Sequence, residues 1–424
     1  MAEKCIVIGN GCAAMECVKA ARESGYAGEF FVMSDSSLPS YNPMLITYYA
    51  SGKIGYDGLF PYGDSFDFYD RYDAERCFGS PVVSLDTEQR IVTNADGLAA
   101  EYGKCVIATG AAPVLPGAYL GAKDSMLTLR TVEDAARFKE LLGSGKKRVL
   151  VAGASLTGVK AVEALVDAGF DVCLTDIAKN IFPMSSHENC SAIIHKILEE
   201  KNVRLLFGVS AETVEKDGDT FKVKFSGADS PDIYDHIIVC VGVRPNISFV
   251  DPGQIKTDAG ILVDGHMETS AEGVYAVGDV CQGRDIQSGD ARVFALWSNA
   301  RLQGRTAGRN IAGRIEKYAG ALPHNITHFF EQDFIGIGDT SGGDEVYEET
   351  DKAGNRYCRL VFSDKKLKGV NLLNIPEISG MLKYRLTKGL LADSALDELC
   401  DGSIAMNKLY NKYPGIESAF IEKR

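Results

Sequence analysis

Two glycine-containing turns have residue types and spacing that suit the binding of a phosphate group. The first, GNGCAA at 9–14, follows an apolar run; Gly9 would make a tight turn and Gly11 would let a pyrophosphate approach the backbone. Ala14 would let the next helix pack closely on the strand, and the N-terminus of that helix offers N–H groups to phosphates. Asp35 lies 21 residues after Ala14, near the position of a ribose-binding acid. This pattern predicts a dinucleotide site.

The second turn, GASLTG at 153–158, departs from the pattern at one position. Gly153 and Gly158 match, but Ser155 stands where the middle glycine is usual, and its hydroxymethyl group would push a pyrophosphate slightly away or donate one hydrogen bond to it. Asp176 follows 18 residues after Gly158, where a carboxylate favours a free ribose hydroxyl and repels a 2′-phosphate. A nicotinamide cofactor bound here would therefore be NADH rather than NADPH. The alternative is a domain that keeps its fold but has lost the cofactor.

The elements that must hold these turns form two copies of one unit. In each copy an apolar run, a glycine turn, an amphipathic stretch and a second apolar run follow one another, which predicts strand, helix and strand. The segments are 4–9, 13–24 and 30–33 in the first copy, and 148–153, 156–168 and 171–176 in the second. A spacing of about 140 residues indicates two nucleotide domains rather than two halves of one. From about residue 323, short strands at 334–338 and 357–362 precede helical segments around 376–399, which predicts a separate α+β domain.

Composition narrows the class of protein. The 424 residues include 44 glycines but only 13 prolines, which favours an α/β enzyme over a disordered or collagen-like chain. With 45 basic and 58 acidic residues the net charge is −13, which argues against nucleic acid or a membrane surface as a partner. We expect no signal peptide, because a strand begins at Lys4, and no transmembrane helix, because no apolar run is long enough.

Cysteine and histidine usage excludes two further classes. The 11 cysteines are scattered without a C-x-x-C pair, and the six histidines have no metal-ligand spacing. We therefore expect neither a disulfide framework nor a metal site, and we expect reduced thiols of the kind found in cytoplasmic proteins.

Three further motifs carry a family resemblance that covers nearly the whole chain. CVIATGAAP at 105–113, VCVGVRPN at 239–246 and TSAEGVYAVGDV at 269–280 resemble the FAD- and NAD(P)-dependent pyridine nucleotide-disulfide oxidoreductase superfamily. The resemblance implies an α/β fold with two Rossmann-like dinucleotide-binding domains, the NAD domain inserted in the FAD domain, and a C-terminal α+β interface domain. The expected parts are an FAD domain at 1–110 and 246–322, a crossover segment at 111–145, an NAD domain at 146–245 and the interface domain at 323–424.

The resemblance also implies roles for single residues. Asp279, beside Gly278, matches the aspartate that hydrogen-bonds the flavin ribityl chain in the family. Thr109 and Gly110 match the turn where the chain crosses to the NAD domain. Two further cofactor contacts are expected, from the Val82 backbone to the adenine and from Gly242 in the second motif.

Within the superfamily, the chain most resembles the rubredoxin and ferredoxin reductases and the flavin portion of the assimilatory NADH nitrite reductase. The matching segments are YNPML at 41–45, the stretch at 295–313 and the stretch at 359–374. The chain has none of the cysteine clusters that the iron–sulfur and sirohaem domains of that nitrite reductase require, so we do not expect it to be a sirohaem enzyme.

The residues expected beside the flavin lack a redox-active thiol. Relatives carry a cysteine pair, or a single cysteine that would fall near Met44, and methionine forms no thiolate. Electrons are therefore expected to leave reduced FAD directly, for a small iron–sulfur redox protein, a partner subunit or a diffusible acceptor. The C-terminal domain also allows a homodimer.

Two departures from the family lie near the expected reactive face. Many relatives carry lysine or arginine where this chain has Asn42, and glutamate where it has Lys160. One interpretation is that the cation has changed sides and that Lys160 stabilises reduced flavin. The alternative is a surface i,i+3 pair of Lys160 with Glu163. Together with Ser155, these departures keep a rival function open: an NAD-independent or degenerate flavin subunit that relays electrons within a larger redox complex.

Overall fold

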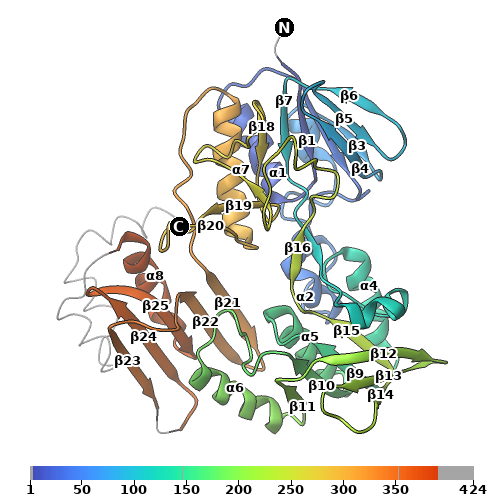
Figure 1. Cartoon of the computed structure of the whole chain (residues 1–424), viewed down its shortest axis with the longest axis vertical. Helices are drawn as coiled ribbons and strands as arrows, with labels where there is room; N and C mark the ends of the chain where they lie inside the picture. Colours follow the sequence, from blue (N-terminus) through green and yellow to red (C-terminus); the bar gives the residue numbers. More distant parts are fainter. Residues whose placement is uncertain (1–2, 146, 352, 390–424) are drawn as a thin grey trace. The chain divides into compact units, whose positions relative to one another are not determined.

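The computed structural model describes residues 3–145, 147–351 and 353–389 of the chain (Figure 1). These residues divide into two compact units. The first runs to His324 and includes the turn Phe329–Glu331, and the second holds Asn325–His328 and the residues from Gln332 onward. Residues 390–424 lie outside the described residues, and so does the end of the helical stretch predicted to reach 399.

The first unit contains a five-stranded parallel sheet that begins with the N-terminal strand. Its order is β18-β7-β1-β2-β3, so that strands far apart in the sequence lie side by side. The strands are β18 (Val274–Ala276), β7 (Lys104–Ile107), β1 (Cys5–Ile8), β2 (Phe30–Ser34) and β3 (Ala74–Phe78). All four residues of β1 are buried, as expected of a strand covered on both faces.

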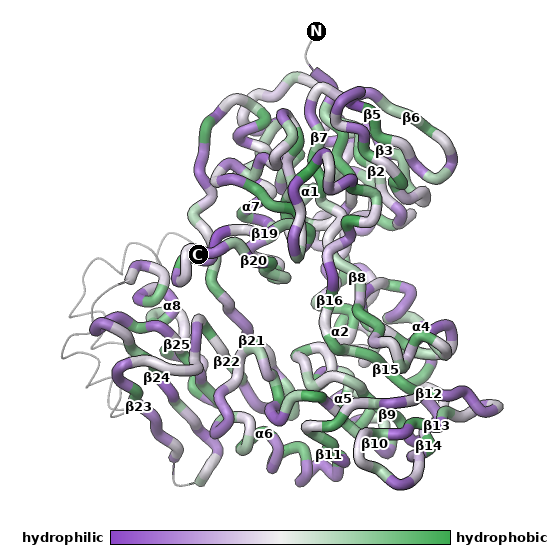
Figure 2. The backbone as a smooth tube through the Cα atoms, in the orientation of Figure 1, coloured by the Kyte–Doolittle hydropathy of each residue, from purple (hydrophilic) through white to green (hydrophobic). Residues whose placement is uncertain are grey.

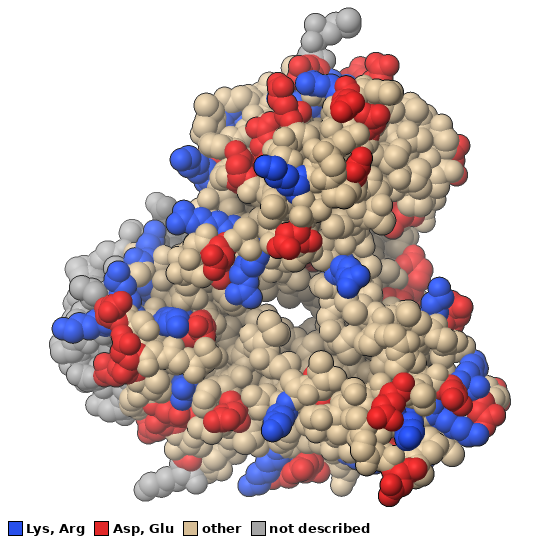
Figure 3. Space-filling model, in the orientation of Figure 1, with Lys and Arg blue, Asp and Glu red and all other residues tan. Residues whose placement is uncertain are grey.

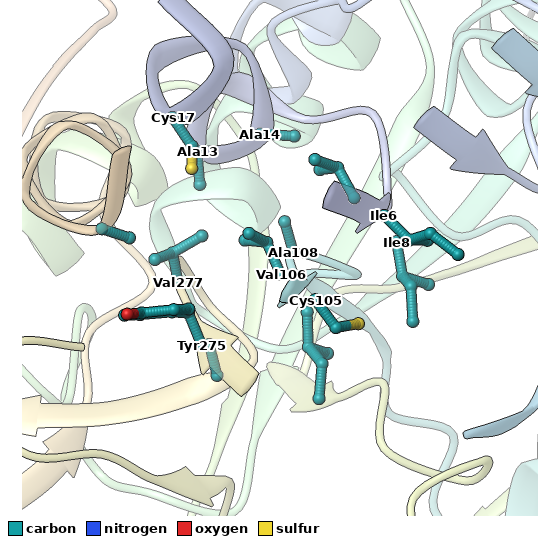
Figure 4. Close-up of a cluster of buried hydrophobic side chains, with 14 of the residues drawn as sticks. Ile6, Ile8, Ala13, Ala14, Cys17, Cys105, Val106, Ala108, Tyr275 and Val277 are labelled. Atoms are coloured by element: carbon teal, nitrogen blue, oxygen red, sulfur yellow. The ribbon is translucent and has the colours of Figure 1, made fainter. Parts of the chain in front are cut away.

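Helices α1 (Cys12–Glu23) and α7 (Trp297–Ile311) pack tightly against each other beside this sheet. Glycine allows the close approach, because a Cβ at Gly304 or Gly308 would collide with the α1 backbone. Figure 4 shows the resulting core, in which Ala13 and Cys17 of α1 face the strand side chains, including Val106 of β7. This core fixes the start of α1, where the first glycine turn lies.

A second parallel sheet repeats the arrangement within the first unit. Its order is β11-β10-β9-β15. The strands are β11 (Arg204–Phe207), β10 (Asp171–Asp176), β9 (Arg148–Ala152) and β15 (His236–Val239). Helix α5 (Leu156–Asp167) connects β9 to β10, and α6 (Glu188–Glu200) connects β10 to β11. The connection β9–α5–β10 is the second strand–helix–strand unit that the sequence predicts, and β10–α6–β11 extends it.

Smaller sheets complete the first unit, and several of their strands border the glycine turns. They are the three-stranded sheet β4 (Val82–Asp86), β5 (Ile91–Asn94) and β6 (Ala99–Glu101); the pair β8 (Ala111–Pro113) and β16 (Val243–Pro245); the sheet β12 (Ala211–Asp217), β13 (Thr220–Phe225) and β14 (Asp232–Tyr234); and the sheet β17 (Ile261–Leu262), β19 (Cys281–Arg284) and β20 (Ala291–Val293). The shorter helices are α2 (Ile46–Ala50), α3 (Asp67–Arg71), α4 (Val132–Gly143) and the 3-10 turns η1 (Pro43–Leu45), η2 (Asp57–Leu59) and η3 (Gly117–Ser125). In Figure 2 the core strands of both parallel sheets are largely hydrophobic, whereas β12 is largely hydrophilic.

The second unit is an α+β structure. Its sheet has the order β21-β22-β25-β24-β23, with β21 (His324–Phe329), β22 (Gln332–Gly338), β23 (Glu345–Thr350), β24 (Tyr357–Ser363) and β25 (Lys366–Leu373). The turn η4 (Pro376–Ile378) and helix α8 (Ser379–Lys388) follow. The strands predicted at 334–338 and 357–362 are confirmed as parts of β22 and β24.

The predicted fold class is confirmed: two parallel Rossmann-like sheets and a C-terminal α+β unit. The finer domain boundaries at 110, 145, 245 and 322 stay a prediction.

No helix in the described part of the chain has the length and hydrophobicity that a membrane span requires. On the face seen in Figure 3, acidic and basic side chains are interspersed.

Candidate functional site

A cavity of about 480 Å³ in the first unit brings together residues from segments far apart in the sequence. Six of the residues predicted to bind a cofactor line it, namely Gly9, Gly11, Asp35, Val82, Thr109 and Gly110. Ala14 is fully buried in α1 instead, where it packs the helix on the sheet. Val82 lies at the first position of β4, and exposed Asp35 follows the last residue of β2.

The first glycine turn leaves the start of α1 open to a ligand. Gly9 has a φ of +110°, and a Cβ there would collide with the carbonyl group of Ala108. Gly11 caps α1 with no side-chain hydrogen bond, and a Cβ built on it would meet nothing within 4 Å. Because no side chain caps this helix end, its first N–H groups and its partial positive charge remain available to a phosphate.

An ion pair joins the cavity to the residue predicted to bind the ribityl chain. Arg130, which lines the cavity, places a guanidinium nitrogen 2.9 Å from a carboxylate oxygen of Asp279. The side chain of Asp279 is only 14% exposed. Gly278 precedes it with a φ of +83°, and its N–H donates a hydrogen bond of 2.8 Å to Gln303. The cavity lining therefore includes a cation that suits a pyrophosphate.

The sequence motifs do not predict Arg130 as a site residue. Its nearest signal is Thr131, the N-cap of α4, which forms a reciprocal capping box with Asp134. That pattern could have placed Arg130 just before a helix. It could not have shown the direction of the side chain, because the partner is 149 residues away.

The crossover turn is held by reciprocal hydrogen bonds. The Thr109 hydroxyl donates to the Asn246 carbonyl at 2.8 Å, and the Asn246 amide donates back to the Thr109 carbonyl at 3.0 Å. Gly110 adopts a φ of +64°, and β8 then pairs with β16 in antiparallel fashion. These contacts position the cavity wall at the point where the chain leaves the first sheet.

The second glycine turn is capped by its own serine. Gly153 has a φ of +108°, and a Cβ at Gly153 or Gly158 would collide with backbone atoms. The Ser155 hydroxyl accepts a hydrogen bond from the Gly158 N–H at 3.2 Å and donates one to the Cys240 carbonyl at 2.8 Å. Of the two effects expected of Ser155, donation of a hydrogen bond to a pyrophosphate is not available in this arrangement, because the hydroxyl proton is donated to Cys240, which follows β15. Helix α5 also differs from α1 in being capped by a side chain.

Asp176 lies at the end of β10, beside the second turn. One carboxylate oxygen accepts a hydrogen bond from Ala154 N–H, and the other accepts one from Ala178 N–H, both at 2.8 Å. These contacts hold the carboxylate at the turn, where an adenosine ribose would lie in a Rossmann-like domain. Gly242, with a φ of +115°, follows β15, and its carbonyl accepts a hydrogen bond from Val114.

Lys160 is buried in an ionic cluster. Its ammonium pairs with the carboxylate of Glu163, one turn along α5, and lies 4.6 Å from the centre of the Tyr48 ring of α2. The other oxygen of Glu163 accepts hydrogen bonds from Lys53 and from the Phe330 N–H, both at 3.1 Å. The i,i+3 pair considered as an alternative is therefore present, but the expectation that it would lie on the surface is wrong, because the two side chains are only 9% and 7% exposed.

The segment 41–45, which the sequence places at the reactive face, contains the 3-10 turn η1 immediately before α2. The Asn42 side chain accepts a hydrogen bond of 3.0 Å from Met44 N–H and so caps η1. Met44 is 60% exposed, whereas Tyr41 and Pro43 line the cavity.

The ten cysteines in the described residues form no disulfide with one another, and nine of them are buried. Burial, followed by the charge of Asp279, raises the pKa of the Cys12 thiol to about 12. Burial alone raises the pKa of Cys17 to about 12, and burial followed by the charge of Asp134 raises that of Cys240 to about 12. A thiol with such a pKa is a poor nucleophile at neutral pH. Cys400 lies outside the described residues.

Two buried serine hydroxyl groups without a hydrogen-bond partner bear on whether the cavity fits a nucleotide. Ser40 and Ser80 are 1% and 3% exposed, and neither hydroxyl has a hydrogen-bond partner among the described residues. They directly precede the lining residues Tyr41 and Pro81. Unpaired buried donors are costly, so they suit a polar ligand in the adjacent cavity. No group of three or more metal-binding side chains occurs in the described residues.

Comparisons with known proteins agree with this geometry. The family model described as "Pyridine nucleotide-disulphide oxidoreductase" matches residues 3–304. The chain is 29% identical over 373 residues to the NADH-dependent phenylglyoxylate dehydrogenase subunit epsilon of Aromatoleum evansii, covering 87% of each chain. It is 23% identical over 409 residues to the NADH-rubredoxin oxidoreductase of Clostridium acetobutylicum, covering 96% of this chain and 99% of the relative.

A solved structure has the same fold. The ferredoxin reductase for the CYP199A2 system from Rhodopseudomonas palustris superposes with a TM-score of 0.79 at 25% identity, covering 88% of this chain and 91% of that one.

Proposed function

This chain belongs to the pyridine nucleotide-disulphide oxidoreductase family, and we propose that it passes electrons from NADH through FAD directly to a protein acceptor. The enzyme is an NADH-dependent flavoprotein oxidoreductase with FAD and NADH as cofactors. Bound FAD supplies the chemistry, because it accepts a hydride and releases electrons one at a time. The chain's own residues bind and orient the cofactors and provide the charged groups of the site.

We assign the cavity to FAD. The uncapped start of α1 and the Arg130 guanidinium would hold the pyrophosphate, and Asp35 would hold the adenosine ribose. Asp279, oriented by Arg130, would accept a hydrogen bond from the ribityl chain. Val82, Thr109 and Gly110, with Gly278, would shape the wall around the cofactor.

We assign the second glycine turn to NADH. Gly153 and Gly158 allow the turn, and Asp176 would bind the ribose hydroxyls and repel a 2′-phosphate. Gly242 would border the same site. Ser155 keeps its hydroxyl on Cys240 and Gly158, so the remaining N–H groups of the first turn of α5 would carry the phosphate.

The exposed side chain of Met44 is the observation that carries the proposal of direct electron transfer. Methionine at this position offers no thiolate, and the described residues that line the cavity include no cysteine. A small iron–sulfur protein fits as the acceptor, since one relative is an NADH-rubredoxin oxidoreductase and one solved structure of the same fold is a ferredoxin reductase.

A second candidate is a flavin subunit that relays electrons within a larger complex, with a weakened or absent NAD site. The capped turn at Ser155 favours the weakened NAD site. The relative from Aromatoleum evansii is a subunit of an NADH-dependent dehydrogenase, so its name favours only the place in a larger complex. The acceptor would then be a partner subunit rather than a diffusing protein.

Anaerobic addition of NADH to the purified flavoprotein tests the two candidates. Bleaching of the visible flavin absorption supports the NADH reductase. An unchanged spectrum, with bleaching by dithionite, supports the relay subunit.

Lys160 and Asn42 complete the proposal as residues of the reactive face. Lys160 would favour the negatively charged reduced flavin by its positive charge. Asn42 would hold the Tyr41–Leu45 segment in place through its bond to Met44.

A further inference from the structure

Asn10, the middle residue of the first glycine turn, lines the cavity and uses both ends of its side-chain amide. Its Nδ2 group donates a hydrogen bond of 2.9 Å to the Leu38 carbonyl, and its Oδ1 atom accepts one from the Tyr69 hydroxyl. An amide nitrogen only donates and a carbonyl oxygen only accepts, so the Leu38 contact fixes the orientation of the Asn10 amide. The Asn10 side chain therefore links the glycine turn to two other segments of the chain.

Tyr69 is held in one place by the residues around it. It lies on α3 and is 2% exposed, and its ring centre is 5.5–5.9 Å from the ring centres of Phe66, Phe68 and Phe78. Tight packing of this kind leaves a buried ring little freedom, so the position of its hydroxyl is fixed as well. Burial raises the pKa of Tyr69 to about 12, against the effect of a hydrogen bond with the Ser40 backbone. The hydroxyl therefore keeps its proton at neutral pH and can donate it to Asn10.

Segment 36–40 lies between two residues that line the cavity, Asp35 and Tyr41. The Asn10 amide holds this segment at the Leu38 carbonyl. We assign the glycine turn to the pyrophosphate of FAD and Asp35 to the adenosine ribose. A tie between the turn and the segment that follows Asp35 thus holds both binding surfaces in place before the cofactor arrives, which lowers the cost of ordering them on binding.

We propose that Asn10 and Tyr69 are positioning residues that hold segment 36–40 on the first glycine turn, and that they thereby set the preference of the site for the adenosine diphosphate half of FAD. The inference rests on the proposed function, since it assumes that the cavity binds FAD. It adds that Tyr69, which is not among the residues lining the cavity, controls cofactor affinity through Asn10.

The test compares the affinity of the FAD-free chain for FAD with its affinity for riboflavin. Riboflavin has the flavin ring and the ribityl chain but neither the pyrophosphate nor the adenosine. Quenching of flavin fluorescence measures both dissociation constants without NADH. Tyr69→Phe keeps the buried ring but removes the hydroxyl donor, so FAD should bind about five- to tenfold more weakly. The affinity for riboflavin should not change, because the variant affects only the surfaces that bind the other half of FAD.

A double variant separates positioning through Asn10 from packing alone. Asn10→Ala should weaken FAD binding at least as much as Tyr69→Phe does, and the double variant should bind FAD no more weakly than Asn10→Ala. Tyr234→Phe is the matched control, because Tyr234 is also 2% exposed and its hydroxyl donates to Asp232 at 3.3 Å. Tyr234 packs in the hydrophobic cluster around the second parallel sheet, so its variant should change neither affinity.

Equal FAD affinity in the unaltered protein and in Tyr69→Phe would overturn the inference. An equal loss of FAD and riboflavin affinity, or additive effects in the double variant, would overturn it as well. If Asn10→Ala did not fold, Tyr69→Phe and its control would still decide. An unaltered chain that binds no FAD would overturn the proposed function and this inference with it, whereas FAD binding that neither variant changes would overturn the inference alone.

Discussion

The guanidinium of Arg130 lies 2.9 Å from the carboxylate of Asp279, and the two residues are 149 positions apart in the chain. Arg130 lines the cavity from the segment just before α4, and Asp279 follows β18. The pair therefore connects the crossover segment to the turn that we assign to the flavin. It holds the Asp279 carboxylate in one direction without cancelling its ability to accept further hydrogen bonds.

Replacement of Asp279 by alanine should weaken or abolish FAD binding. A hydrogen bond to a charged group contributes about 1.5–3 kcal/mol, which is about ten- to a hundredfold in affinity. The bound flavin that remains after gel filtration measures the effect. Asp279→Asn keeps the shape of the side chain and one acceptor oxygen, so it should retain less flavin than the unaltered protein but more than Asp279→Ala. Full flavin retention by Asp279→Ala would show that the carboxylate does not hold the cofactor.

NADH should reduce the flavin faster than NADPH, because the Asp176 carboxylate would face the 2′-phosphate of NADPH. Rapid mixing with each cofactor measures the ratio of the two rates. Asp176→Ala should reduce the difference between the NADH and NADPH rates, but it also removes the hydrogen-bond acceptor of the Ala154 and Ala178 N–H groups. Asp176→Asn keeps one acceptor for them and so isolates the charge. An NADPH preference in the unaltered protein would mean that Asp176 does not reach the ribose.

Thiol chemistry should be dispensable. Nine of the ten cysteines in the described residues are buried. Burial raises the pKa values of the Cys105 and Cys281 thiols far above the ordinary value of a cysteine. Alkylation of the native protein should therefore leave NADH-driven reduction of a one-electron dye largely intact. Inactivation that tracks the modification of one defined cysteine would reveal a redox centre that the proposal lacks.

Glu16 should contribute to stability in a pH-dependent way. Its side chain is 2% exposed and lies 2.7 Å from both Arg301 and Arg305. Burial alone would raise the pKa of Glu16, but hydrogen bonds from Arg305 and then Arg301 outweigh burial and lower it from 4.5. A lowered folded-state pKa stabilises the protein above the unfolded pKa, and this contribution is lost as the pH falls through the folded one.

Urea unfolding of the unaltered protein and of Glu16→Gln at several pH values measures this contribution. The difference in unfolding free energy should be largest at neutral pH, at about 1.5–3 kcal/mol, because the two arginines that lose their charged partner are 41% and 39% exposed and solvent can hydrate them. It should shrink at pH values below about 4.5, the ordinary carboxyl pKa. A difference that is constant from neutral to acidic pH would mean that the ionised form of Glu16 is not what stabilises the fold.

The sequence predicts the parts of the site that depend on local spacing. Gly9 and Gly153 have a positive φ and pack closely on neighbouring backbone, and Asp176 falls at the end of a strand whose length the apolar run sets. The pair of Lys160 and Glu163 follows from helical periodicity alone. Each of these features lies within one strand–turn–helix unit.

Contacts across long stretches of chain were not predictable in this way. Lys53 and Glu163 are 110 positions apart, and no local pattern indicates which cation a buried carboxylate will meet. The burial of Lys160 has the same cause, because Tyr48 and α2 cover a helix face that looks polar in the sequence. The role of Ser155 also depends on a distant atom, the carbonyl oxygen of Cys240.

The central claim is that electrons pass from NADH to the flavin and then to an iron–sulfur protein without a thiol. Stopped-flow mixing of the alkylated FAD-loaded enzyme with NADH, followed by a rubredoxin as the probe acceptor, tests it most directly. We expect bleaching of the flavin by NADH and then its reoxidation as the rubredoxin is reduced, at rates close to those of the unmodified enzyme. A flavin that NADH does not bleach, or one that is bleached but requires a free cysteine to reduce rubredoxin, would contradict it.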